Sequence, residues 1–132
     1  MDEIVTQFCY DLDNNKFEHA QTLIGKSCEY HFRDQVITGP EDIISCYKGS
    51  LDSVKDQLDT IVFESEIEEL GKGRFRFHFT DIISKDGVEH IHRCEQKISL
   101  SGGEITRIDH VDIPGEVESL NAFFKKVGVT RK

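Results

Sequence analysis

The chain has 132 residues, with 25 acidic and 16 basic side chains and a formal net charge of −9. This length fits one domain over residues 1–132, and so acidic a surface repels nucleic acid and anionic membranes, which excludes both as expected partners. No apolar run approaches the roughly 18 residues that a membrane-spanning helix requires.

The N-terminal part of the chain predicts two helices. Apolar residues recur four apart over residues 2–13, which is a helical period, and the cluster Asp13-Asn14-Asn15 interrupts it. A second helix is expected over residues 16–25, where Gly25 suits the stop.

The next part predicts one strand and a third helix. Residues 27–37 alternate apolar and polar side chains, the period of a half-buried strand. Gly39-Pro40 and the two acidic residues after it indicate a helix start, and apolar positions continue to Val54.

From residue 58 the period changes to two, which predicts a meander of four long strands. They are expected over residues 58–70, 73–83, 88–100 and 104–113. Tight turns join them, and strands joined in this way are antiparallel. A final helix should begin at Pro114 and end at Gly128.

This order of elements indicates the α+β class. We expect N-terminal helices packed on a strongly curved antiparallel sheet, which together form a cone with an internal pocket. The cysteines are far apart and form no C-x-x-C pair, so we expect free thiols in a reducing cytosol. The N-terminus MDEIVTQF begins with acidic residues, unlike a secretory signal, so we expect a cytoplasmic protein.

Three stretches carry a resemblance to a known family: LDNNKFEHAQTLI, YHFRDQVITGPEDI and GGEITRIDHVDIPGEVESLNAFFKKVG. They resemble the nuclear transport factor 2-like superfamily in its SnoaL-like branch, and the likeness covers nearly the whole chain. The resemblance implies a cystatin-like cone. The superfamily contains ketosteroid isomerases, polyketide cyclases, scytalone dehydratases and members without catalysis, so the fold does not specify a reaction.

Asp34 is the first candidate catalytic residue. It shares a strand face with Cys28, Tyr30 and Phe32, which predicts that it points into the cone. A carboxylate in an apolar cavity has a raised pKa, which suits a general base. The resemblance places a proton-shuttling carboxylate there. The alternative is that Asp34 caps the loop or the following helix near Gly39.

The segment VEHIHRCEQKISL, residues 88–100, sets His90, His92 and Cys94 at alternate positions of one strand face. Such side chains lie about 6.5–7 Å apart, so both imidazoles can contact one small molecule. They could also bind a metal with a third ligand, but no spacing identifies that ligand, and we expect no metal. The alternative is a pair of hydrogen-bonded or surface histidines.

The resemblance implies further site residues. Asp13 falls near the first-helix Asp of scytalone dehydratases, but Val62 stands where that family has a strand histidine. Phe8 stands where the isomerases have a tyrosine, which leaves Tyr10, Tyr30 and Tyr47 as possible donors. Some cyclases of this branch carry an acid/base Asp on the closing strand, which suggests Asp109. The face that Asp109 occupies is ambiguous, because a bulge would reverse it.

The predicted pocket wall is largely aromatic. Alternation within the strands indicates that its ligand-binding residues are Tyr30, Phe32, Phe63, Phe77 and Cys94. The stripe of Phe75, Phe77 and Phe79 is typical of a plain core, although the same rings could form the floor of a pocket.

The sequence therefore predicts a domain that binds a small apolar or carbonyl-containing molecule. As an enzyme it would be an isomerase, cyclase or dehydratase without a cofactor, with Asp34 as base and His92, His90 or Tyr47 polarising the oxygen. The alternative is a non-catalytic binding or dimerisation module. We also expect a homodimer formed through the outer sheet face.

Overall fold

The computed structural model describes residues 2–131. Its helices and strands follow in the order α1 (Glu3–Asp13), α2 (Phe17–Thr22), β1 (Ile24–Phe32), β2 (Gln35–Thr38), α3 (Pro40–Asp52), β3 (Thr60–Gly71), β4 (Arg74–Lys85), β5 (Val88–Ser101), β6 (Glu104–Asp112) and α4 (Glu116–Val127). The predicted α+β class and the four-stranded meander β3–β6 are confirmed.

All the strands belong to a single six-stranded sheet in the order β2-β1-β6-β5-β4-β3. Every neighbouring pair is antiparallel except β1 and β6, which run parallel, so the sheet is mixed rather than wholly antiparallel. A parallel pair needs a long crossover, and here α3 and the β3–β5 meander supply it.

The segment predicted as one strand over residues 27–37 is a hairpin. β1 ends at Phe32, a turn follows in which Arg33 has a φ of 55°, and β2 starts at Gln35. β1 also begins earlier than predicted, because Gly25 belongs to this strand and does not end α2. A Cβ on Gly25 would lie 3.2 Å from the carbonyl oxygen of Ile105, so a glycine allows β1 to approach β6.

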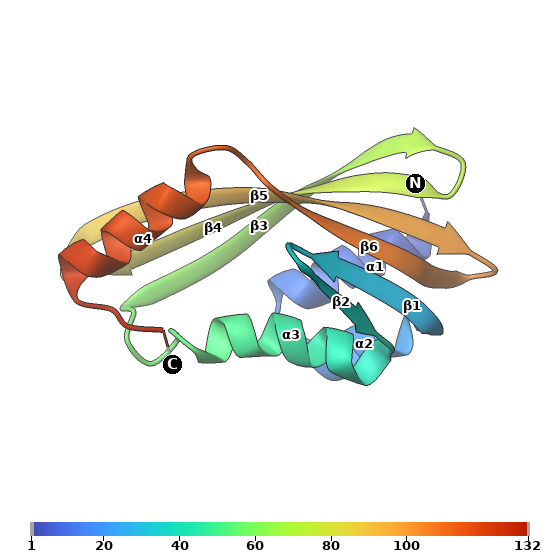
Figure 1. Ribbon diagram of the computed structural model, residues 1–132, viewed down its shortest axis with the longest axis horizontal. Helices are drawn as coiled ribbons and strands as arrows, with labels where there is room; N and C mark the ends of the chain where they lie inside the picture. Colours follow the sequence, from blue (N-terminus) through green and yellow to red (C-terminus); the bar gives the residue numbers. More distant parts are fainter. Residues whose placement is uncertain (1, 132) are drawn as a thin grey trace.

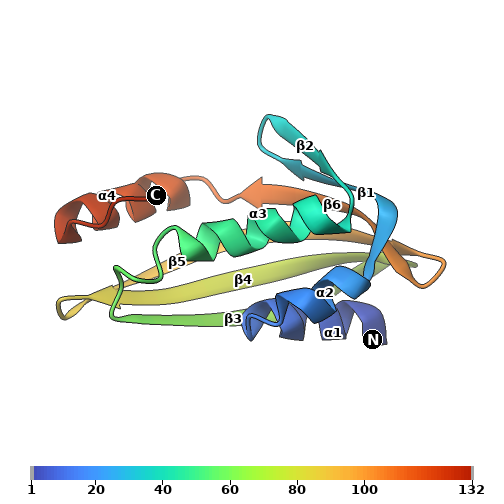
Figure 2. The same cartoon turned by 90° about the horizontal axis from the view of Figure 1, so that it is seen from below.

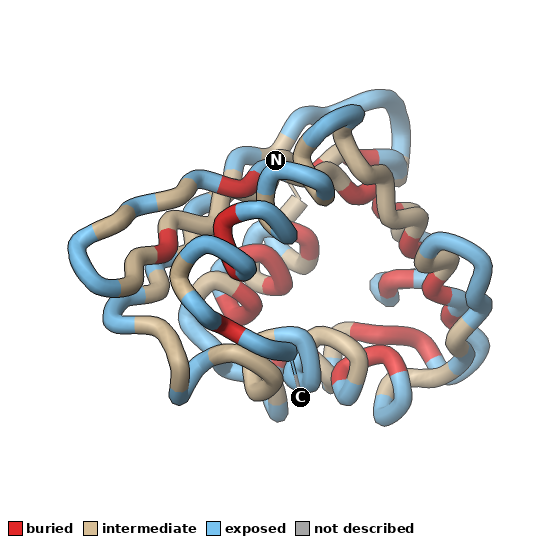
Figure 3. Tube along the Cα trace, turned by 60° about the vertical axis from the view of Figure 1, so that its left-hand side comes forward, coloured by how far each residue is buried: buried red, intermediate tan, exposed pale blue. Residues whose placement is uncertain are grey.

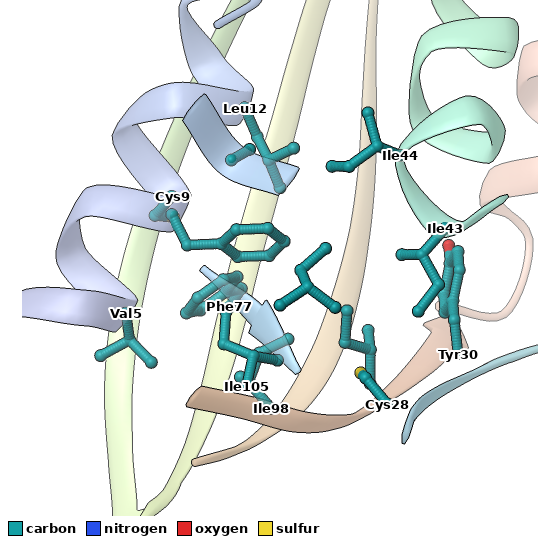
Figure 4. Packing of buried hydrophobic residues seen from close by; sticks show 14 of the residues in the cluster. Val5, Cys9, Leu12, Cys28, Tyr30, Ile43, Ile44, Phe77, Ile98 and Ile105 are labelled. Carbon is teal, nitrogen blue, oxygen red and sulfur yellow. The ribbon is translucent and has the colours of Figure 1, made fainter. Parts of the chain in front are cut away.

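The helices cover one face of the curved sheet. α1, α2 and α3 lie together below the sheet, and α4 packs along β5 at the other end (Figures 1 and 2). The main core lies between α1–α3 and the sheet. Val5 and Leu12 of α1 and Ile43 of α3 pack there. They meet Phe77 and Ile98 of the sheet (Figure 4).

A smaller apolar cluster lies under α4. It consists of Ile83, Phe123, Phe124 and Val129. Along β4 the main core includes Phe75 and Phe77, Phe79 packs against it, and the small cluster starts at Ile83, so the inward position of Asp81 belongs to neither cluster. Loops and hairpin tips are exposed, while buried positions are interspersed along the strands (Figure 3).

A β-bulge in β6 determines which of its side chains point inward. The register shifts between Ser99 and Leu100 of β5, so Thr106 is an extra residue in β6. Ile105 and Ile108 are therefore both fully buried, although they are three residues apart. Beyond the bulge, His110 faces the interior and Asp109 faces outward.

Gly73, in the β3–β4 turn, is a position where we expect alanine to destabilise the fold. Its φ is +70°, and a Cβ there would lie 2.6 Å from the carbonyl oxygen of Leu100. Because that carbonyl is backbone, Gly73→Ala should cost at least about 1–2 kcal/mol in the free energy of unfolding measured with urea. Gly87→Ala, which has a similar φ but open space around it, should cost less. Equal losses in the two variants would contradict the close approach.

Candidate functional site

A cavity of about 300 Å³ lies between the two apolar clusters. That volume is at the small end of the range for small-molecule sites. The cavity brings together most of the predicted pocket residues: Tyr30, Phe32, Tyr47, Phe63, His92 and Cys94. The wall is completed by residues of helix α3 and of the sheet. It also includes Leu120 and Phe124 of α4 and Arg131, which follows α4.

Asp81 and His92 form the polar centre of the cavity wall. They lie directly opposite each other on β4 and β5, so their Cβ atoms are about 4.5–5.5 Å apart. Burial, and secondarily the charge of Asp13, raise the pKa of Asp81 to about 7. No described residue donates a hydrogen bond to its carboxyl group. Asp81 can therefore gain or lose a proton near neutral pH.

His92 is held neutral at the same point. Burial is the main cause that lowers its pKa, although the nearby Glu116 acts in the opposite direction. The side chain is 9% exposed, and its Nδ1 is buried with no partner among residues 2–131. A neutral imidazole can donate one hydrogen bond and accept another, so His92 is suited to hold a polar atom of a ligand.

Asp13 stands beside Asp81 at the C-terminal end of α1. The Ser65 hydroxyl donates a hydrogen bond to Asp13 Oδ2, and the Cys9 thiol donates to Ser65 at 2.9 Å. The pKa of Asp13 is raised, mainly by burial. Two adjacent carboxyl groups in an apolar wall disfavour double ionisation, so the pair holds a proton more readily than either group would alone.

A second polar group is centred on Gln96, which is 3% exposed. Its Oε1 accepts a hydrogen bond from the Tyr47 hydroxyl, and its Nε2 donates to the Tyr30 hydroxyl at 3.0 Å. Nε2 also donates to His110 Nδ1 at 3.3 Å. The amide oxygen and amide nitrogen of Gln96 therefore both have hydrogen-bond partners. The Tyr30 hydroxyl accepts from Gln96, so its own hydrogen can be donated to another acceptor.

This network continues from His110 to the rim of the cavity. His110 Nε2 donates to Asp112 at 2.8 Å, and Arg33 Nε donates to the same carboxylate at 2.9 Å. The Arg33 bond is the main cause that lowers the pKa of Asp112 to about 2. Burial raises the pKa values of Tyr30 and Tyr47, so both phenols stay protonated and act as donors.

Gln96→Leu should destabilise the protein by about 1–3 kcal/mol, because it leaves the buried Tyr47 hydroxyl and His110 Nδ1 without partners. Urea unfolding measures the loss. An unchanged midpoint would show that these groups find water or other partners instead, which would contradict a rigid network.

Two predicted catalytic carboxylates lie outside the cavity. The predicted inward orientation of Asp34 is wrong, because the strand ends at Phe32 and Asp34 is exposed in the β1–β2 turn. Asp109 lies on the outer face of β6, where the Arg107 guanidinium donates to both its oxygens at 3.0–3.2 Å. Neither carboxylate lines the pocket.

Of two other predicted site residues, one belongs to the main core and one packs against the small apolar cluster. Phe77 is fully buried in the main core and does not line the cavity, so its placement as a ligand contact is wrong. His90 stacks on Phe123 of α4, with ring centroids 5.1 Å apart, and it too lies outside the cavity wall. Its Nε2 is buried and has no partner among the described residues.

The sequence reasoning missed Asp81, Gln96 and His110. The signal for Asp81 was present, because it continues the alternation of Phe75, Phe77 and Phe79 on the inward face of β4. Gln96 likewise shares the face of His92 and Cys94. The role of His110 as a hydrogen-bonding partner depends on the bulge in β6, which turns its side chain inward.

The described residues contain neither a metal-binding cluster nor a membrane-spanning helix. Within residues 2–131, no group of three or more His, Cys, Asp or Glu side chains is placed to hold a metal ion. In the same part of the chain, no helix is long and apolar enough to cross a membrane.

No protein-family model and no curated protein matches this sequence. Solved structures do match. A hypothetical protein from Catenulispora acidiphila with a ketosteroid isomerase-like fold, in complex with trimethylamine, superposes with a TM-score of 0.68 at 15% identity, over 98% of this chain and 95% of that chain. A candidate polyketide cyclase from Sinorhizobium meliloti gives a TM-score of 0.65 at 12% identity, over 83% and 94%.

A nuclear transport factor 2-like protein of unknown function from Cytophaga hutchinsonii gives a TM-score of 0.63 at 14% identity, over 83% of this chain and 96% of that chain. At such low identity the likeness concerns the fold. The helices packed on a curved six-stranded sheet agree with it. This chain therefore has the nuclear transport factor 2-like fold.

Proposed function

We propose that this protein binds a small, largely apolar molecule that carries a carbonyl or hydroxyl group and transfers a proton on it without a cofactor. The reaction would be an isomerisation, a cyclisation or a dehydration. The observation that carries the proposal is Asp81, a carboxyl group with a pKa of about 7 and no hydrogen-bond partner among the described residues, in the wall of a 300 Å³ cavity.

The proposed chemistry uses Asp81 as the base in place of Asp34. Asp81 removes a proton from the carbon next to the carbonyl group, and neutral His92 beside it donates a hydrogen bond to the oxygen on which negative charge develops. Asp81 then returns the proton to another carbon or to a leaving hydroxyl group, which regenerates its carboxylate. The Tyr30 hydroxyl, held by Gln96, is available to a second oxygen farther along the cavity.

Proton exchange on a ketone tests this proposal without knowledge of the natural substrate. The α-protons of 1-tetralone, a small bicyclic ketone, exchange with deuterium in heavy water, and NMR follows the rate. The protein should accelerate this exchange above the buffer rate. Asp81→Asn should abolish the acceleration, and Asp34→Asn, in the exposed turn, should retain it. No acceleration, or equal rates for both variants, would contradict the proposal.

We also propose a homodimer formed through the outer sheet face. Val62, Ile82 and Ile91 lie opposite one another on β3, β4 and β5, and Val62 and Ile91 are 48% and 37% exposed. Ile91→Lys should shift a dimer to monomer in sedimentation equilibrium. Val36→Lys, at an exposed position of β2, is the control and should leave the dimer intact. A monomeric wild type would contradict the proposal.

A further inference from the structure

Two arginines stand at the cavity of an acidic protein. The chain has a net charge of −9, yet Arg33 and Arg131 are the only Lys or Arg side chains among the described residues of the cavity wall. Arg33 comes from the β1–β2 turn and Arg131 from the segment after α4, so two distant parts of the chain bring positive charge to one place.

Packing holds both guanidinium groups against the wall. The Arg33 guanidinium carbon lies 4.6 Å from the centroid of the Phe32 ring, and that of Arg131 lies 5.0 Å from the Phe124 ring. The backbone of Thr130, next to Arg131, is fixed by Gln57, whose Oε1 accepts from the Thr130 nitrogen at 2.9 Å.

Only one of the two arginines is paired with a carboxylate of the described residues. Arg33 binds Asp112, whereas Arg131 forms no ion pair with any residue in the described range 2–131. Burial, and secondarily the charge of Arg33, lower the pKa of Arg131, as expected for like charges held near each other. A further anion at this place would relieve that repulsion.

The arginines lie to one side of the proposed base. Asp81 on β4 and Asp112 on β6 flank β5, where they lie opposite His92 and Cys94. Strands are about 4.8 Å apart, so these two columns of side chains are separated by roughly 10 Å. An anionic group held by Arg33 and Arg131 would leave the apolar body of a ligand to cross the cavity toward Asp81.

We propose that the ligand of this cavity is an apolar carboxylate, whose carboxylate group binds Arg131 and Arg33 while its uncharged body lies against the aromatic wall. The inference rests on the proposed function only in that the cavity binds a small molecule. It specifies the charge of that molecule and the place of its charged group. Guanidinium groups suit a carboxylate because their planar donors match its two oxygens.

Three probes that share one ring system and differ in charge test the inference: 2-naphthoate, 2-naphthamide and 2-naphthylmethylammonium. Isothermal titration calorimetry at low salt gives their dissociation constants. We expect 2-naphthoate to bind at least about tenfold more tightly than the amide. Arg131→Gln should remove most of that preference, read as the ratio of the two dissociation constants within the variant. Lys126→Gln, which removes an equal charge from the exposed face of α4, should leave the preference intact.

The outcomes separate this inference from the proposed function. Equal affinities for the three probes would overturn the inference and leave small-molecule binding standing. Preference for the ammonium would also overturn it, since Asp13 and Asp81 would then be the charged contacts. A loss of preference that is the same in Arg131→Gln and Lys126→Gln would show that only net charge matters, which again overturns it. Failure of every probe to bind would contradict both proposals.

Discussion

Asp81→Asn is expected to make the protein more stable above neutral pH while it abolishes proton transfer. The pKa of Asp81 is about 7 in the folded protein, against an ordinary value of 3.8, so the folded state binds this proton more tightly than the unfolded state does. The stability that this proton contributes is fully present below the ordinary value. It is lost progressively as the pH rises from 3.8 to about 7, above which the ionised carboxylate remains in an apolar wall.

An asparagine at this position has no charge to bury. Because Asp81 is only half-buried, we expect a gain of about 1–3 kcal/mol at about pH 8 and little change at about pH 4. Urea unfolding at the two pH values measures it. Asp34→Asn, in the exposed turn, should show neither the gain nor its pH dependence. A variant at Asp81 that is less stable at alkaline pH would contradict the burial of an ionisable group.

Phe77→Ala is expected to be among the most destabilising single substitutions in the chain, at about 3–5 kcal/mol. Phe77 is fully buried, and its ring centroid lies 6.2 Å from that of Phe8 and 5.7 Å from that of Phe79. Removal of the ring leaves a cavity where α1 meets the sheet. Urea unfolding gives the loss.

Phe63→Ala is the matched comparison, because Phe63 is a half-buried ring of the cavity wall. It should cost less stability than Phe77→Ala and should weaken the binding of 2-naphthamide, a probe without charge. If Phe77→Leu weakened ligand binding while the stability stayed near wild type, Phe77 would be a ligand contact and its assignment to the core would be wrong.

Local patterns predicted most of the fold. The alternation of apolar residues identified β3, β4, β5 and β6, and Gly-containing turns indicated the hairpins between them. The pairing of β1 with β6 was not predictable, since it joins residues about eighty positions apart and runs parallel. Gly25 was misread because a helix stop and a close approach between strands both favour glycine.

In the candidate site, too, some residues could be placed from local patterns and others could not. Side chains on long, regular strands, such as Phe63, His92 and Cys94, could be assigned to the inner face from period alone. Asp34 could not, because the strand ends two residues before it and a turn redirects its side chain. The position of Asp81 was predictable from its parity with Phe79, whereas its raised pKa depends mainly on burial in the folded protein and secondarily on Asp13, which comes from a distant helix.

The central claim is that Asp81 exchanges its proton near neutral pH inside the cavity. Carboxyl ¹³C NMR of aspartate-labelled protein, followed from acid to alkaline pH, measures this directly, and the resonance missing in Asp81→Asn identifies the group. We expect a titration midpoint of about 7 for Asp81. A midpoint near the ordinary value of 3.8 would mean that Asp81 binds its proton too weakly to exchange it near neutral pH, and would contradict the burial of this carboxyl group.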